Sequence, residues 1–146
     1  EINKLGEFEE DNIREILRTR TRFHNNKARY IMQSQNTWPK IKKLLESEDI
    51  LALRNTICDN VNGYGLKEAG HFLRNIGKSD NKIAILDRHI LRNLKNLGVI
   101  EDDKIKNRKH YFEIEQKFLE FSKKQNIPID ELDMYFWSQE NGDVFK

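Results

Sequence analysis

Residues 61–71 read VNGYGLKEAGH, and this stretch decides the fold that we predict. The residues just before the turn, ILALRNTICDNV, and those just after it, LKEAGHFLRNIG, both show the apolar spacing of helices. Glycine adopts positive φ without strain and lets the backbone approach a partner closely, so Gly63 and Gly65 predict a tight turn. We therefore expect two helices joined by a hairpin over about residues 49–77.

The hairpin glycines also predict a contact with an anion. Backbone amides at the turn and at the following helix start form a nest suited to a DNA phosphate. Two glycines between helices are weak evidence alone. Val61, Gly63, Gly65 and Ala69 together form a fuller pattern, which is more specific for the helix-hairpin-helix of nucleic-acid-binding proteins. The sequence thus favours DNA as a partner, with Gly63 and Gly65 at a phosphate.

Lys67 opens the second helix, where a cation is disfavoured by a few tenths to about 1 kcal/mol because the helix start already carries partial positive charge. A lysine that is partly desolvated beside such amides has its ammonium form disfavoured. The neutral amine is then a nucleophile. The alternative is a surface lysine on a first turn, which is the commoner role for a lone lysine.

Asp87 follows the apolar run IAIL and precedes the amphipathic stretch RHILRNLKNLG. This position predicts an N-cap, with the carboxylate accepting hydrogen bonds from helix amides. The same amides hold the carboxylate ionised. An ionised carboxylate can stabilise positive charge that develops on a sugar when a glycosidic bond breaks.

Composition narrows the class of protein. The chain has 146 residues, of which 37% are hydrophobic and 34% charged, with only 2 prolines and 7 glycines, which favours a mostly helical domain. No run approaches the roughly 18 apolar residues of a membrane span, and the first residues lack a signal-peptide pattern, so we expect an intracellular protein.

One cysteine excludes an internal disulfide and a four-cysteine iron–sulfur cluster. With four scattered histidines, the chain shows no metal-site spacing, and we predict no cofactor.

Charge is distributed unevenly although its sum is only +2. Residues 14–29, REILRTRTRFHNNKAR, hold six Lys and Arg against one Glu, and such a cluster can follow a phosphate backbone. An ordinary solvated helix end and loop explains the same charges equally well.

The expected fold class is all-α. We predict a single helical domain over residues 1–146, with the hairpin, a segment carrying Asp87 over 83–98, and C-terminal helices over 109–146. Pro39 is expected in the first turn of its helix and Asp130 at an N-cap. The predicted helices span residues 9–18, 26–35, 38–46, 49–60, 66–76, 88–97, 109–125 and 130–140.

GYGLKEAGHFLRNIG followed by AILDRHILRNL closely resembles the helix-hairpin-helix DNA glycosylases, in which an aspartate follows a hairpin lysine by some 20 positions. Within that superfamily the chain looks most like the archaeal-type 8-oxoguanine DNA glycosylases, which are bifunctional glycosylase and lyase enzymes. The resemblance runs from about residue 20 to the end and includes RFHNNKARYI and LDMYFWSQENGDVFK.

The resemblance implies roles for individual residues. Lys67 would attack C1′ of the damaged nucleoside, expel the base and form a Schiff base, and β-elimination would nick the strand. Asp87 would support the developing charge and the proton transfers. The flipped base would lie between Phe23 and Trp137, with Lys146 helping to separate 8-oxoguanine from guanine. The implied partner is double-stranded DNA containing oxidised guanine, bound by a monomer.

Each of these residues has a structural alternative. Phe23 and Trp137 fit a hydrophobic core, and Lys146 fits a frayed terminus. His89, directly after Asp87, would orient the cap or contact a phosphate, although a histidine in such a place is more often structural.

The chain departs from the family at its start, where members carry further helices that complete the cleft. We therefore expect a fragment, or a fold lacking some N-terminal helices. Three rival functions remain open: a non-catalytic helix-hairpin-helix module that binds phosphates, a related glycosylase for another damaged base, and a helical protein-interaction domain.

Overall fold

The computed structural model describes residues 9–141, and all regular secondary structure within that range is helical. No helix in this range is long and apolar enough to cross a membrane. The helices are α1 (Glu10–Arg18), α2 (His24–Leu44), α3 (Ile50–Asn60), α4 (Leu66–Asn75), α5 (Arg88–Asn96), α6 (Arg108–Gln125) and α7 (Ile129–Asn141).

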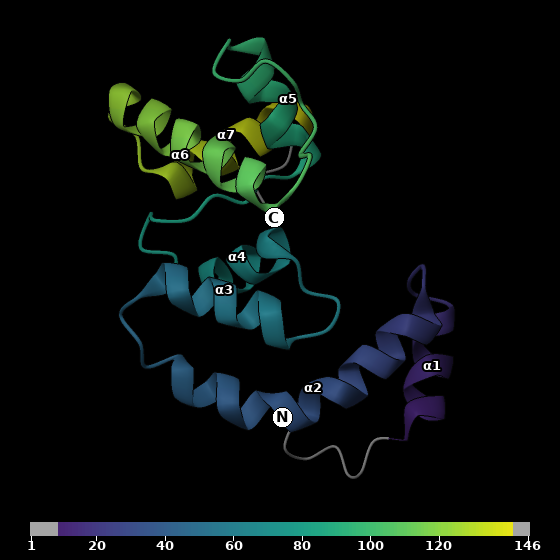
Figure 1. The fold of residues 1–146 in the computed structure, drawn as a ribbon. Helices are drawn as coiled ribbons and strands as arrows, with labels where there is room; N and C mark the ends of the chain where they lie inside the picture. The colour runs from purple at the N-terminus through teal and green to yellow at the C-terminus, as the bar shows by residue number, and fades with distance from the viewer. Residues whose placement is uncertain (1–8, 142–146) are drawn as a thin grey trace.

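Figure 1 shows the helices in three groups. The long α2 runs along the base of the molecule and carries α1 at one end. The α3–α4 pair lies above α2, and α5, α6 and α7 form an upper lobe. The chain passes from the middle pair into this lobe through residues 83–86, which belong to no helix and are buried.

The second helix corrects the prediction of separate helices over 26–35 and 38–46, because α2 continues through Pro39. Proline inside a helix removes one N–H and leaves the carbonyl four residues earlier without its donor. Both Pro39 and Gln35 are exposed here, so water can reach that carbonyl and the helix is not forced to end.

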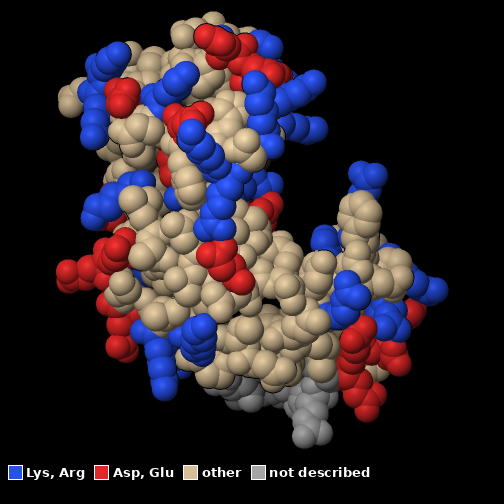
Figure 2. Space-filling model, in the orientation of Figure 1, with Lys and Arg blue, Asp and Glu red and all other residues tan. Residues whose placement is uncertain are grey.

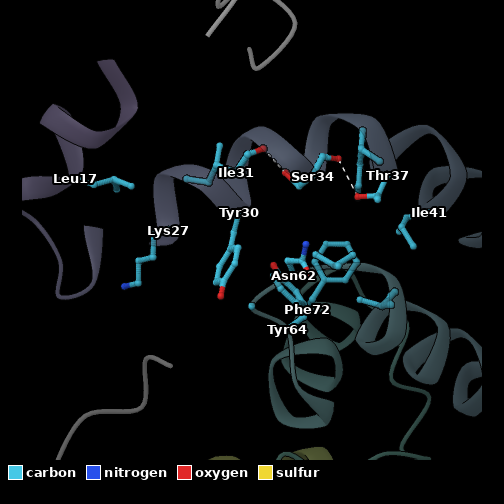
Figure 3. A pocket seen from close by; sticks show the side chains of 14 residues that line it. Leu17, Lys27, Tyr30, Ile31, Ser34, Thr37, Ile41, Asn62, Tyr64 and Phe72 are labelled. Carbon is cyan, nitrogen blue, oxygen red and sulfur yellow. Dashed lines mark hydrogen bonds between the residues drawn. The ribbon is translucent and has the colours of Figure 1, made fainter. Parts of the chain in front are cut away.

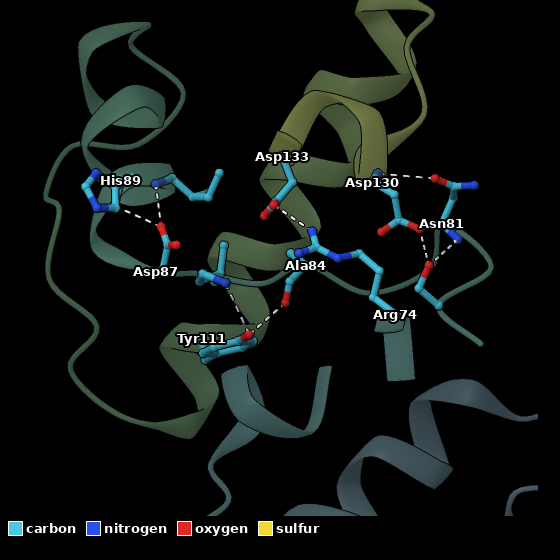
Figure 4. A network of polar contacts seen from close by, with 11 residues as sticks. Arg74, Asn81, Ala84, Asp87, His89, Tyr111, Asp130 and Asp133 are labelled. Atoms are coloured by element: carbon cyan, nitrogen blue, oxygen red, sulfur yellow. Dashed lines mark hydrogen bonds and ion pairs between the residues drawn. The ribbon is translucent and has the colours of Figure 1, made fainter. Parts of the chain in front are cut away.

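The last helix also begins earlier than predicted. It starts at Ile129, which places Asp130 in the first turn instead of at the N-cap. The Asp130 carboxylate accepts a hydrogen bond from the Ser79 hydroxyl, and its own N–H donates to Asn81 Oδ1 at 3.2 Å. Asp130 therefore ties α7 to the loop that follows α4 (Figure 4).

The hairpin between α3 and α4 is present as predicted, with Asp49 capping α3 by accepting from the N–H of Ala52 at 2.9 Å. Gly63 has φ +85°, and a Cβ there would lie 2.6 Å from the ring of Tyr30, so both conformation and space require glycine. Gly65 has φ −90°, which corrects the expectation of positive φ at both glycines.

The core consists of two clusters. One lies between α2, α3 and α4 and contains Ile41, Ile50, Leu53, Ile57, Ala69, Leu73 and Ile83. The other fills the upper lobe and includes Leu86, Ile90, Leu94, Tyr111, Ile114, Phe118, Leu132 and Phe136. Residues of the 83–86 segment belong to both clusters, so this segment is where the two parts of the molecule join.

A buried polar network holds that segment. Arg54 of α3 forms an ion pair with Glu115 of α6, and the two side chains are 1% and 6% exposed. Glu115 Oε1 also accepts the N–H of Ala84 at 2.8 Å. The Tyr111 hydroxyl donates to the Ala84 carbonyl at 2.7 Å (Figure 4). Burial raises the pKa of Tyr111 well above its ordinary value, which keeps this hydroxyl a donor.

A second ion pair joins the same two parts. Arg74 of α4 contacts Asp133 of α7, with Nη1 and Oδ1 2.6 Å apart and both side chains largely buried (Figure 4). Two buried pairs therefore connect the hairpin helices to the upper lobe, one through α6 and one through α7.

Glu115→Ala is expected to lower the free energy of unfolding by about 3–5 kcal/mol, since it leaves the buried Arg54 without its counter-charge. Urea denaturation measures the change. Glu113→Ala is the matched control on the same helix, because Glu113 is exposed and its contact with Lys109 spans 3.8 Å; we expect it to cost less than about 1 kcal/mol. Equal effects of the two substitutions would contradict the importance of the buried pair.

Gly63→Ala is expected to destabilise the protein more than Gly77→Ala. Both residues have positive φ, so alanine costs roughly 1–2 kcal/mol at either position. Only at Gly63 does the added Cβ also meet a ring, since nothing lies within 4 Å of the Cβ position at Gly77. Thermal unfolding of the two variants tests this, and a Gly63→Ala melting temperature at or above that of Gly77→Ala would show that Tyr30 moves aside freely.

Candidate active site

Lys67 is the second residue of α4 and lies directly after the hairpin. Its Nζ is 2.9 Å from Oε1 of Glu68, and its side chain is 43% exposed. The group is therefore only partly removed from water, and its contact is a carboxylate, the natural partner of an ammonium. The uncharged amine expected from the sequence stays a prediction.

Glu68 is a residue that the sequence analysis missed. One carboxylate oxygen contacts Lys67, and the other, Oε2, accepts the N–H of Gly65 at 3.1 Å. Partial burial by itself raises the pKa of Glu68, but the hydrogen bond from Lys67, backbone hydrogen bonds and the charge of Lys67 together bring it below its ordinary value. The signal was present, because Gly65 and Glu68 have the N-cap and N3 spacing of a capping box.

Asp87 caps α5, as predicted. Its Oδ1 accepts the N–H groups of His89 and Ile90, both at 2.9 Å (Figure 4). Residues 83–86 are buried, so the segment that ends at Asp87 is fixed at its start by the core and at its end by the helix. A half-buried carboxylate in this position is held in one orientation.

His89 participates in the cap through its backbone, while its ring has a separate contact. Nε of Arg88 donates to Nε2 of His89 at 3.2 Å. The contact of His89 with a phosphate stays a prediction, and so do the phosphate contacts of Gly63 and Gly65. The Gly65 N–H, one of the amides expected to face phosphate, is occupied by Glu68 in this structure.

Phe23 lies at the N-cap of α2 with φ +59° and is 73% exposed. The alternative of a core aromatic is therefore wrong for Phe23. Positive φ is uncommon for a bulky residue and marks a position worth testing for function. Trp137 lies on α7 and is partly buried, and Lys146 lies outside the described residues.

Positive charge gathers around the open side of the molecule. Figure 2 shows a hollow between the arm formed by α1 with the start of α2 and the rest of the molecule, with Lys and Arg side chains on both sides of the opening. Exposed arginines at positions 20, 22 and 29 belong to the arm, and Arg88 is exposed at the start of α5. The predicted basic cluster is therefore accessible to a polyanion.

A separate apolar groove of about 400 Å³ lies between α2 and the hairpin (Figure 3). Aliphatic and aromatic side chains line most of it, and Trp38 and Tyr64 each pack edge-on against Phe72. Of the predicted site residues within 9–141, only Gly63 lines this groove. It is therefore distinct from the surroundings of Lys67 and Asp87.

No group of three or more His, Cys, Asp or Glu side chains within residues 9–141 is arranged to hold a metal ion.

Sequence comparison identifies relatives over most of the chain. A family model described as 8-oxoguanine DNA glycosylase matches residues 1–127. The 8-oxoguanine DNA glycosylase/AP lyase of Fusobacterium nucleatum is 41% identical over 132 residues, covering 86% of this chain and 60% of that protein. The protein of the same name from Methanocaldococcus jannaschii is 39% identical over 127 residues, with the same two coverages. The chain thus spans about 60% of the length of these relatives.

Solved structures agree in fold. The 8-oxoguanine glycosylase/lyase of Methanocaldococcus jannaschii, in complex with a 15mer DNA containing 8-oxoguanine, superposes with a TM-score of 0.86 at 33% identity, covering 95% of this chain and 67% of that one. The 8-oxoguanine DNA glycosylase of Thermotoga maritima gives a TM-score of 0.85 at 30% identity, covering 96% and 67%. The expected helix-hairpin-helix glycosylase fold is therefore confirmed.

The helical architecture, the glycine hairpin that carries Lys67, and the family match over residues 1–127 all lead to one assignment. This chain belongs to the 8-oxoguanine DNA glycosylase family.

Proposed function

We propose that this protein is a bifunctional DNA glycosylase and AP lyase that removes 8-oxoguanine from double-stranded DNA. One observation carries the proposal: the family's fold places Lys67 at the first turn after the hairpin and Asp87 at a helix cap. A binding module that contacts only phosphates has no use for this lysine and aspartate together. The protein would act inside the cell as a monomer.

In the proposed reaction the Lys67 amine attacks C1′ of the damaged nucleoside. The bond from C1′ to the base breaks, and the base leaves with the bonding electrons and takes up a proton. The amine gives up a proton as it bonds to C1′. The bond from C1′ to O4′ then breaks, O4′ takes up a proton, and the adduct becomes a protonated Schiff base. Loss of a proton from C2′ then expels the 3′ phosphate by β-elimination, which nicks the strand.

Asp87 supports this chemistry by its charge and its fixed position. Positive charge develops on the sugar as the glycosidic bond breaks, and an ionised carboxylate nearby stabilises that charge. The two amides of α5 that hold Asp87 oppose its protonation and restrict its rotation. The carboxylate also provides an acceptor for the proton transfers.

Recognition of the damaged base is assigned to residues from different parts of the chain. Phe23 and Trp137 would stack on the flipped base, and the exposed position of Phe23 favours this role. Lys146 would help to distinguish 8-oxoguanine, whose N7 carries a hydrogen that guanine lacks. Gly63, Gly65 and His89 would contact phosphates, and the exposed arginines near residue 20 would follow the DNA backbone.

Lys67→Gln is expected to abolish the covalent adduct that borohydride traps between the protein and DNA, because glutamine cannot form a Schiff base. The assay uses duplexes that carry 8-oxoguanine, uracil, an abasic site or no lesion. The variant should have the melting temperature of the unchanged protein, since the Lys67 side chain is half-exposed and its substitution removes few packing contacts.

An adduct selective for 8-oxoguanine and absent in Lys67→Gln supports the proposed function. An adduct with uracil instead points to a related glycosylase for another base. Binding without any adduct, insensitive to lesions and strongly salt-dependent, would make the protein a non-catalytic DNA-binding module.

Asp87→Asn is expected to slow base release by roughly 100-fold or more because it removes the charge that stabilises the transition state. Asparagine is a good N-cap, so the helix start should remain intact. Asp49→Asn is the matched control, because Asp49 caps α3 in the same way without a proposed role in chemistry. Single-turnover release of 8-oxoguanine measures both, and equal rates for the two variants would remove Asp87 from the reaction.

A further inference from the structure

One carboxylate connects the proposed nucleophile to the hairpin backbone. Glu68 Oε1 lies 2.9 Å from Nζ of Lys67, and Glu68 Oε2 lies 3.1 Å from the N of Gly65. The lysine amine is therefore held, through Glu68, to an amide of the turn. Both side chains are 43% exposed, so the arrangement is open to an incoming ligand.

The backbone at Gly65 is adapted to this contact. A Cβ at this position would lie 2.9 Å from Glu68 Oε2, which is too close for two unbonded atoms unless the side chain shifts. Since Gly65 has an ordinary extended conformation, positive φ is not the reason for glycine here. Glycine leaves the space in which the carboxylate reaches the amide.

We propose that Glu68 is a positioning residue that restrains the Lys67 amine, and that a DNA phosphate loosens this restraint by displacing the Glu68 carboxylate from the Gly65 amide. This inference rests on the proposed function, in which Lys67 is the nucleophile. It adds a residue and an order of events: DNA first takes the Gly65 amide, Glu68 keeps only its ion pair with Lys67, and that pair must then break in the bound complex before the amine reaches C1′.

The competition is physically reasonable because both competitors are anions. An amide at a helix start binds a carboxylate or a phosphate by the same interaction. DNA brings a phosphate together with further contacts to the basic arm, whereas the exposed pair of Glu68 and Lys67 contributes little by itself. The carboxylate is held ionised in the free protein, so it is present to be displaced at neutral pH.

A purely structural role for Glu68 is the competing explanation, since a glutamate at this position also caps the helix. The two roles separate in Glu68→Gln. The amide oxygen of glutamine can still accept the Gly65 N–H, so capping is retained, but the negative charge that holds the ammonium is lost. Glu68→Ala removes both, and its melting temperature reports the contribution of the cap.

The experiment measures single-turnover borohydride trapping on a duplex with an abasic site, over a range of DNA concentrations. It uses the whole chain and compares the unchanged protein with Glu68→Gln, Glu68→Ala, Lys67→Gln and Glu113→Gln. Glu113→Gln is the matched control, because it removes one exposed glutamate charge paired with a lysine on α6. The maximal rate and the half-saturating DNA concentration are determined separately.

We expect Glu68→Gln to raise the maximal rate about two- to fivefold, the factor that corresponds to losing one exposed ion pair. Glu113→Gln should leave the maximal rate unchanged. Glu68→Ala should trap at least as fast as the unchanged protein while melting at a lower temperature. This pattern supports restraint of the amine, because the loss of a residue that only caps the helix would not accelerate the reaction.

Three results would overturn the role of Glu68 while leaving the proposed function intact: an unchanged maximal rate in Glu68→Gln, a lower one, or a change confined to the half-saturating DNA concentration. The last would mean that Glu68 only repels phosphate. Absence of any adduct from the unchanged protein would overturn the proposed function, and the role of Glu68 with it.

Discussion

The buried ion pair between Arg54 and Glu115 is the interaction on which the rest of the structure depends. Two charges removed from water require each other, so α3 and α6 cannot separate without exposing both. Glu115 also accepts the N–H of Ala84, which holds the segment of residues 83–86 between the two core clusters. Asp87 follows that segment directly. The position of the Asp87 carboxylate relative to the hairpin is therefore set by a contact that includes neither Asp87 nor the hairpin turn.

Helix termini provide the second constraint, and they affect Lys67 and Asp87 in opposite ways. A helix start favours an anion, so Asp87 stabilises the start of α5, the position from which we propose that its charge acts. The same rule disfavours a cation at the start of α4. In the structure, Glu68 provides an anion beside Lys67, and the same carboxylate also accepts the N–H of Gly65. This carboxylate offsets the unfavourable position of the lysine charge, and it is the group that we propose restrains the amine.

The predictions that succeeded concerned local interactions. Both hairpin helices, the cap at Asp87 and the positive φ of Gly63 follow from residue types and their spacing within a few positions. The failures had physical reasons that local patterns do not contain. The helix continues through Pro39 because Gln35 and Pro39 are exposed and water can reach the freed carbonyl. Gly65 has an ordinary φ of −90°, and a Cβ there would meet only the end of the Glu68 side chain at 2.9 Å. Exposure and side-chain proximity decided both.

The amino-acid sequence by itself determined the helical class, the hairpin, the family and the two residues proposed for the chemistry, because periodicity, caps and turn residues act over a few positions. The tertiary structure alone decided how those pieces meet. Arg54 and Glu115 are 61 residues apart, and no spacing rule pairs them. It also decided that Phe23 faces solvent, since exposure depends on which other elements cover a residue.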